Sequence, residues 1–76
     1  MQVAVYQTLS NELLVFTFDV KAEIPESKFD LVRHLLKKEY PFFSNYKILK
    51  AYITHDDQII VQLFEEKTQQ YLAIRL

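Results

Sequence analysis

Apolar and polar residues alternate in five separate segments of the chain, and this period of two predicts β-strands. The segments are residues 2–9 (QVAVYQTL), 13–20 (LLVFTFDV), 46–54 (YKILKAYIT), 58–65 (QIIVQLFE) and 71–76 (YLAIRL). They are rich in Val, Ile, Phe and Tyr, which favour strands. The polar stretches SNE, HDD and KTQQ connect three neighbouring pairs of segments. Connections this short make the strands they join antiparallel.

Residues 26–40 change to the spacing of a helix. Pro25 suits the first turn of a helix, and Pro41 prevents its continuation. Acidic residues near the start and Lys37 and Lys38 near the end complement the helix dipole. The apolar residues form one stripe that can face a sheet: Phe29, Val32, Leu35, Leu36 and Tyr40.

The order of elements is therefore ββαβββ. It predicts a two-layer α+β fold in which one helix covers one face of a mainly antiparallel sheet. We expect residues 1–76 to form a single compact domain. The alternative is a β-grasp-like mixed sheet, with the first strand central and parallel to a late strand. The pattern does not determine the order of the strands in the sheet.

Alternation also sorts the strand residues onto two faces of the predicted sheet. One face collects aliphatic residues and Phe and belongs against the helix; it includes Val5, Phe16, Phe18, Val20 and Leu63. The other face carries four of the five tyrosines, although a solvated face would be mostly charged and Thr-rich. Tyrosine suits surfaces that are dry on one side and hydrogen-bonded at the tip. The predicted partner or dimer interface on this face is Tyr6, Val15, Ile48, Tyr52, Ile60, Phe64 and Tyr71.

Three arrangements would account for this tyrosine-rich face. A second copy of the chain covers it, which makes a homodimer the leading expectation. The sheet curls into a partial barrel and shields the face itself. A different protein binds there. A one-residue error in the face assigned to any strand would invert that strand's contribution.

The stretch EYPFFSNY, residues 39–46, concentrates aromatic residues at a turn. We expect one of Phe42 and Phe43 to close the core beneath the helix end and the other to lie at the rim of the tyrosine-rich face. Lysines flank the stretch, and rings interleaved with basic residues are typical of single-stranded nucleic-acid binding. The residues predicted to contact a nucleic acid, or alternatively a protein partner, are Lys37, Lys38, Phe42, Phe43, Tyr46, Lys47 and Lys50.

The composition argues against several classes of chemistry. With no glycine, phosphate-cradling loops and nucleophile elbows lose the residue on which their backbones depend. With no cysteine, there is neither a disulfide framework nor a thiolate metal site. The cluster His55-Asp56-Asp57 is interpreted as a polar hairpin tip, because adjacent residues in a turn seldom converge on one point. We therefore predict no catalytic residue, no cofactor and no metal.

Size and charge complete the prediction. A chain of 76 residues with 50% hydrophobic content has apolar surface beyond what so small a core needs, which favours association. A net charge of −1 argues against broad attraction to nucleic acid or anionic membranes. No signal peptide or apolar span is visible, so we expect a cytoplasmic protein without membrane association. The expected function is a small non-enzymatic interaction or regulatory module. The alternative is single-stranded nucleic-acid binding through residues 37–52.

Overall fold

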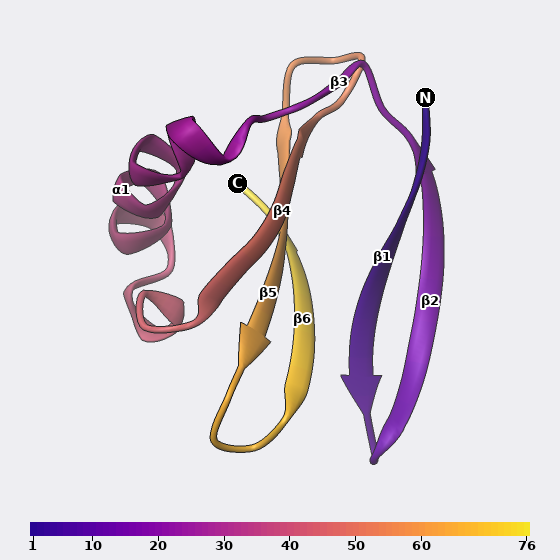
Figure 1. The fold of residues 1–76 in the computed structure, drawn as a ribbon, viewed down its shortest axis with the longest axis vertical. Coiled ribbons are helices and arrows are strands. Elements are labelled where there is room, and N and C mark those ends of the chain that lie inside the picture. Colours follow the sequence, from indigo (N-terminus) through magenta and orange to yellow (C-terminus); the bar gives the residue numbers. More distant parts are fainter.

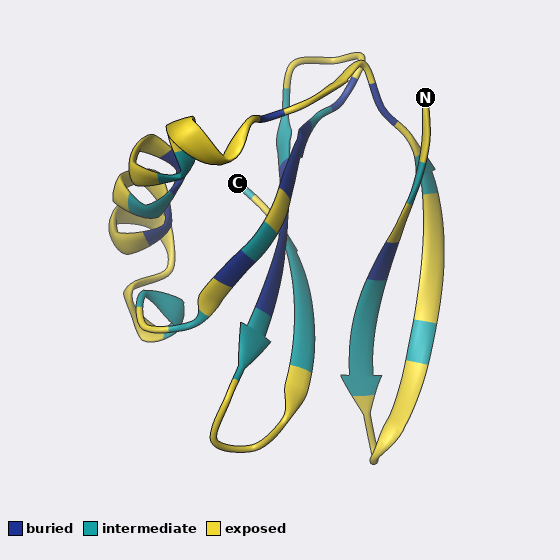
Figure 2. Cartoon of the chain, in the orientation of Figure 1, coloured by how far each residue is buried: buried dark blue, intermediate teal, exposed yellow.

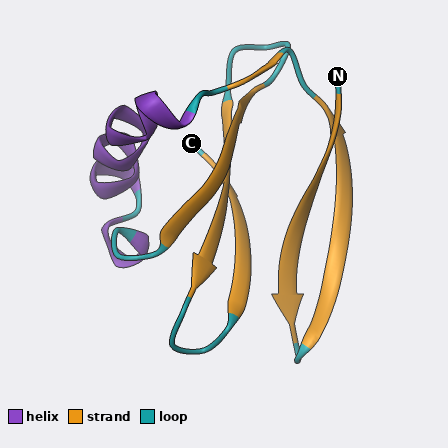
Figure 3. Ribbon diagram, viewed as in Figure 1, coloured by secondary structure: helices purple, strands orange, loops and turns teal.

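The computed structural model describes residues 1–76 as an α+β fold with one α-helix and six strands in antiparallel sheets (Figures 1 and 3). The predicted α+β class with a single helix is confirmed. The strands and the helix are β1 (Gln2–Leu9), β2 (Glu12–Asp19), β3 (Ala22–Glu23), α1 (Phe29–Glu39), β4 (Lys47–Ile53), β5 (Ile59–Glu65) and β6 (Gln70–Arg75). Single 3-10 turns flank the helix: η1 (Glu26–Lys28) and η2 (Pro41–Phe43). The two-residue β3 is the element that alternation did not predict.

The strands form two sheets, one of which is the β1–β2 hairpin alone. The other sheet has the order β3-β4-β5-β6, and each neighbouring pair is antiparallel. The parallel pairing of the β-grasp alternative does not occur. Figure 1 shows α1 on one side of the β4–β6 strands and the hairpin on the other. The hairpin is thus a third layer rather than part of the helix-covered sheet.

A two-residue turn fixes the register of the hairpin. Ser10 and Asn11 both adopt left-handed backbone conformations, with φ of 52° and 64°. Left-handed conformations at both positions define the turn that matches the natural twist of paired strands. The pairing then runs without a break from Leu9–Glu12 to Gln2–Asp19.

Replacing this turn by Asn-Gly, with Ser10→Asn and Asn11→Gly, is expected to stabilise the protein. Neither native residue is glycine, so both carry the steric cost of positive φ, and removing that cost contributes about 1 kcal/mol. For a domain of this size the melting temperature should rise by about 4–8 °C. Thermal unfolding followed by circular dichroism measures the change. Ser27→Gly, in the right-handed η1 turn, is the control and should not raise the melting temperature.

The helix side of the four-stranded sheet holds the larger apolar core. Val32 and Leu36 of α1 pack against residues of β4 and β5, including Val61 and Leu63. Leu35, expected on the same stripe, is exposed, because it lies about 100° around the helix from Leu36. Figure 2 shows the buried segments of β4 and β5 between the other two layers.

A second, smaller core lies on the opposite side of the sheet. Val5 and Val20 of the hairpin segment pack on Tyr52 and Ile60, with Phe18 at the margin. Val5, Phe18 and Val20 were expected beneath the helix, and this expectation is wrong. The eleven-residue α1 covers one face only, so the apolar side of the hairpin covers the other. The chain therefore shields much of its tyrosine-rich face itself.

A bulge in β4 reverses part of the expected alternation. Ile48 pairs with Leu63, but Lys50 pairs with Gln62, so one extra residue is inserted at Leu49. An inserted residue moves the following side chains to the opposite face of the sheet. Ile48 therefore shares the helix-side core with Ala51 instead of lying beside Tyr52.

Candidate protein-interaction surface

The Gln62 side chain attaches the hairpin to the four-stranded sheet. Gln62 lies in β5 with only 3% of its surface exposed. Its Nε2 donates to the Tyr6 carbonyl oxygen at 3.0 Å, and its Oε1 accepts a hydrogen bond from the Tyr6 N–H. The carboxamide thus imitates the backbone of a neighbouring strand and satisfies both main-chain groups of Tyr6.

Side chains of β1 also occupy the free edge of β6. The Tyr71 N–H donates to Thr8 Oγ1 at 2.9 Å, and the Ala73 N–H donates to Gln7 Oε1 at 3.1 Å. The rings of Tyr6 and Tyr71 lie 5.6 Å apart, and Tyr71 lies 4.9 Å from the Phe64 ring. The edges of β1 and β6 therefore close one another.

The outer edge of β2 remains open. Tyr6 pairs with Val15, and both main-chain groups of Tyr6 are used by Gln62, so this pair exchanges no hydrogen bond. In antiparallel strands such pairs alternate with hydrogen-bonded ones, and their main-chain groups point away from one another. The N–H and C=O groups of Leu13, Val15 and Thr17 therefore point outward. β2 has no other neighbouring strand, and no backbone bond outside the ladders reaches these residues.

Apolar side chains lie along this open edge. Leu13 is 54% exposed, Val15 56% and Phe16 46%. Figure 2 shows β2 exposed along most of its length. Edge strands are normally protected by lysine, proline or a bulge, but residues 13–18 contain no charge or proline and the register has no break. We call the segment Leu13–Thr17 the open edge.

The seven residues predicted as one interface do not share an exposed face. Ile48, Tyr52 and Ile60 are buried within the chain, so their assignment to a partner surface is wrong. The bulge accounts for Ile48, and the hairpin covers Tyr52 and Ile60. Tyr6, Phe64 and Tyr71 are half-buried, because the Tyr71 ring packs against the rings of the other two.

Val15 is the one residue of the seven whose side chain is exposed to solvent. The prediction missed Leu13 and Phe16. The run LLVFTF, apolar on both alternating faces and without a central charge, was the signal for them.

The basic-aromatic residues are dispersed. Lys37 and Lys38 lie in the last turn of α1, and Lys50 Nζ lies 3.3 Å from Glu23 Oε2. Phe42 is 81% exposed, whereas Phe43 and Tyr46 pack against the helix-side core. This division between Phe42 and Phe43 is the one expected for the aromatic turn.

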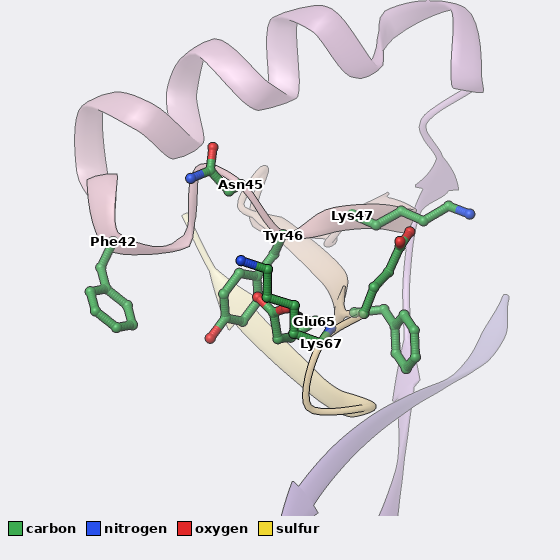
Figure 4. A pocket seen from close by; sticks show the side chains of 8 residues that line it. Phe42, Asn45, Tyr46, Lys47, Glu65 and Lys67 are labelled. Carbon is green, nitrogen blue, oxygen red and sulfur yellow. Dashed lines mark hydrogen bonds between the residues drawn. The ribbon is translucent and has the colours of Figure 1, made fainter.

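A shallow depression of about 480 Å³ lies beside this turn (Figure 4). Its lining is Phe42, Asn45, Tyr46, Lys47, Phe64, Glu65, Glu66 and Lys67. The two carboxylates offset the two lysines, so the depression offers no consistently basic track for a phosphate backbone.

The remaining polar clusters hold the N-terminus and the turn between β4 and β5 in place. Asp19 accepts a hydrogen bond from the Met1 ammonium at 2.9 Å, which lowers the pKa of the Asp19 carboxyl, and His55 Nε2 lies 3.3 Å from the other oxygen. The Thr54 hydroxyl donates to Asp56 and lowers its pKa. No group of three or more His, Asp or Glu side chains is placed to hold a metal ion.

No protein-family description, curated protein or solved structure matches the chain. None of its helices has the length and apolar character needed to cross a membrane.

Proposed function

We propose that this protein is a non-enzymatic interaction module that associates with itself through the open edge of β2. The observation that carries the proposal is an eight-residue strand with one side unpaired, flanked by exposed apolar side chains. Unpaired main-chain groups on such a strand are a ready template for another strand. Addition of a strand supplies affinity through main-chain hydrogen bonds and specificity through alternate side chains.

The opposite end of the strand arrangement supports a closed assembly. The four-stranded sheet ends at β3, which has only two residues. The edges of β1 and β6 are occupied by one another through Gln62, Thr8 and Gln7. The part of β4 that β3 leaves unpaired, residues 47–50, is short and has a lysine at each end, which disfavours strand pairing. With β2 as the one long edge available per molecule, pairing is completed by a dimer and does not continue into a filament.

Sedimentation equilibrium across micromolar concentrations tests this function. We expect a dimer for the native protein, and a Kd at least about tenfold higher for Val15→Lys, because lysine on an edge disfavours strand pairing. Leu31→Lys is the matched control, since Leu31 is exposed on α1, away from β2, and the variant should still dimerise. A native protein that is monomeric throughout this range would contradict the proposal.

A further inference from the structure

We infer that two copies pair β2 against β2 in antiparallel fashion, with the two-fold axis passing beside Val15. This inference rests on the proposed function and specifies its partner and register. The result is a continuous four-stranded sheet of the two hairpins, in the order β1-β2-β2-β1.

The open edge restricts which registers are allowed. The outward main-chain groups belong to Leu13, Val15 and Thr17, so these odd-numbered positions must face odd-numbered positions of the second copy. Glu12 and Asp19 are the charged residues of β2, and one is even-numbered and the other odd-numbered. They consequently never face each other in any allowed register, and a register centred near the middle of β2 also keeps Glu12 from Glu12 and Asp19 from Asp19 of the second copy.

Among the allowed registers, the one centred on Val15 gives the best match of side chains. Val15 faces Val15 of the second copy, and Leu13 faces its Thr17. Asp19 then faces Asn11, so a carboxylate lies opposite an amide that can donate to it. Shifting by one step in one direction places Asp19 opposite Leu13, which desolvates a carboxylate against an aliphatic side chain. Shifting in the other direction places Thr17 opposite the turn residue Asn11, so one hydrogen-bonded pair at each end of the ladder is lost.

This register also gives full use of the unpaired groups. Leu13, Val15 and Thr17 of each copy form about six intermolecular main-chain hydrogen bonds. Leu14 faces Phe16 on the side of the hairpin that carries the smaller core, so Phe16, exposed in the single chain, gains an apolar neighbour. Leu13 and Val15 on one face of the new sheet, and Leu14 and Phe16 on the other, thereby gain cross-strand neighbours from the second copy.

Introduced cysteines test the register directly, because the chain has no cysteine of its own. Directly opposed residues of a hydrogen-bonded pair have Cα atoms about 5.5 Å apart, within the range of a disulfide. Leu13 and its counterpart are offset by four residues, or about 13 Å along the strand, which is too far. The variants are Val15→Cys, Leu13→Cys, Thr17→Cys and, as a collision control on α1, Leu31→Cys.

Under mild oxidation at micromolar concentration, Val15→Cys should form disulfide-linked dimers at least about tenfold faster than the other three variants alone. An equimolar mixture of Leu13→Cys and Thr17→Cys should cross-link at a rate comparable with that of Val15→Cys. Sedimentation of each reduced variant confirms whether it dimerises.

The results that would contradict the register can be distinguished from those that would contradict the proposed function. If the native protein sediments as a dimer but Val15→Cys cross-links no faster than Leu31→Cys, the register is wrong and the interaction module stands. Rapid cross-linking of Leu13→Cys alone also rejects the register. Absence of both dimer and cross-link rejects the register and the proposed function together.

Discussion

Replacing Gln62 with leucine should lower the free energy of unfolding by about 3 kcal/mol, a large share of the stability of so small a domain. The variant has nearly the same volume but leaves the Tyr6 N–H and C=O groups without their partners. A main-chain group that is shielded from water and unbonded costs about 1–3 kcal/mol. Urea unfolding measures the loss. A decrease below about 1 kcal/mol would mean that water replaces the amide, or that the hairpin docks through Val5 and Val20 alone.

Gln70→Leu is the matched control for this change. Gln70 begins β6, is exposed, and its side chain makes no hydrogen bond within the chain. A surface substitution of this kind should alter stability by no more than about 0.5 kcal/mol. A similar loss in both variants would show that leucine itself, rather than the missing amide, is responsible.

Gln62→Glu adds a pH signature to the same prediction. The introduced carboxylate accepts from the Tyr6 N–H but cannot donate to the Tyr6 carbonyl oxygen, and burial raises its pKa. Its protonated form regains the donor, so the favourable state is fully present below the ordinary glutamate pKa. Stability is then lost as pH rises through the raised pKa. Relative to Gln62→Leu, this variant should become more stable as pH falls towards about 4.

The second large effect is expected at the aromatic turn, where two adjacent phenylalanines should behave differently. Phe43→Ala should lower the free energy of unfolding by about 2–3 kcal/mol, somewhat less than for a fully buried ring. The Phe43 ring lies 6.2 Å from Tyr40, 5.4 Å from Phe42 and 5.2 Å from Tyr46, and it packs against the helix-side core. Its removal opens a cavity beneath the end of α1.

Phe42→Ala provides the matched comparison in the same turn. Phe42 is 81% exposed, so truncating it should change stability by no more than about 0.5 kcal/mol. Parallel urea unfolding of the two variants measures the difference. Equal losses would indicate that the edge-to-face contact between the two rings, rather than burial of Phe43, stabilises the turn.

Docking of the hairpin also bears on self-association. Gln62 holds the inner edge of β1 at Tyr6, and β2 is thereby kept as the outer strand. If Gln62→Leu loosens the hairpin without unfolding the larger core, the open edge loses its rigid support. Dimerisation should then weaken even though no residue of β2 has changed, because a mobile strand must be ordered before it can pair.

Local sequence was sufficient to predict the helix and the five longer strands, but not the two-residue β3. Alternation over residues 2–9 and 13–20 locates the hairpin within one residue, and Asn11 marks a turn that needs positive φ. Helical spacing and Pro41 define α1 apart from its first turn, which is a 3-10 turn. The unequal burial of Phe42 and Phe43 also follows from the sequence, because adjacent rings at a turn cannot both enter the core beneath one helix.

Tertiary structure decided which face each strand presents to which layer. Period-two alternation distinguishes the two sides of a strand, but it does not say which layer each side meets. Val5 and Val20 could therefore be identified as core residues but not assigned to the side opposite the helix. The bulge at Leu49 depends on pairing with β5, so the burial of Ile48 with the helix could not be read locally.

The candidate site depended most strongly on long-range contacts. Gln62 is a polar residue in an apolar strand, and its role appears only when Tyr6, distant in sequence, lies beside it. That contact closes β1, leaves β2 as the free edge and exposes Val15. The sequence by itself determined the five longer strands, the hairpin, the helix and the surplus of apolar surface, because these arise from local periodicity and composition. Which surface stayed open was decided by the docking of the hairpin, because that docking depends on side chains meeting across the whole chain.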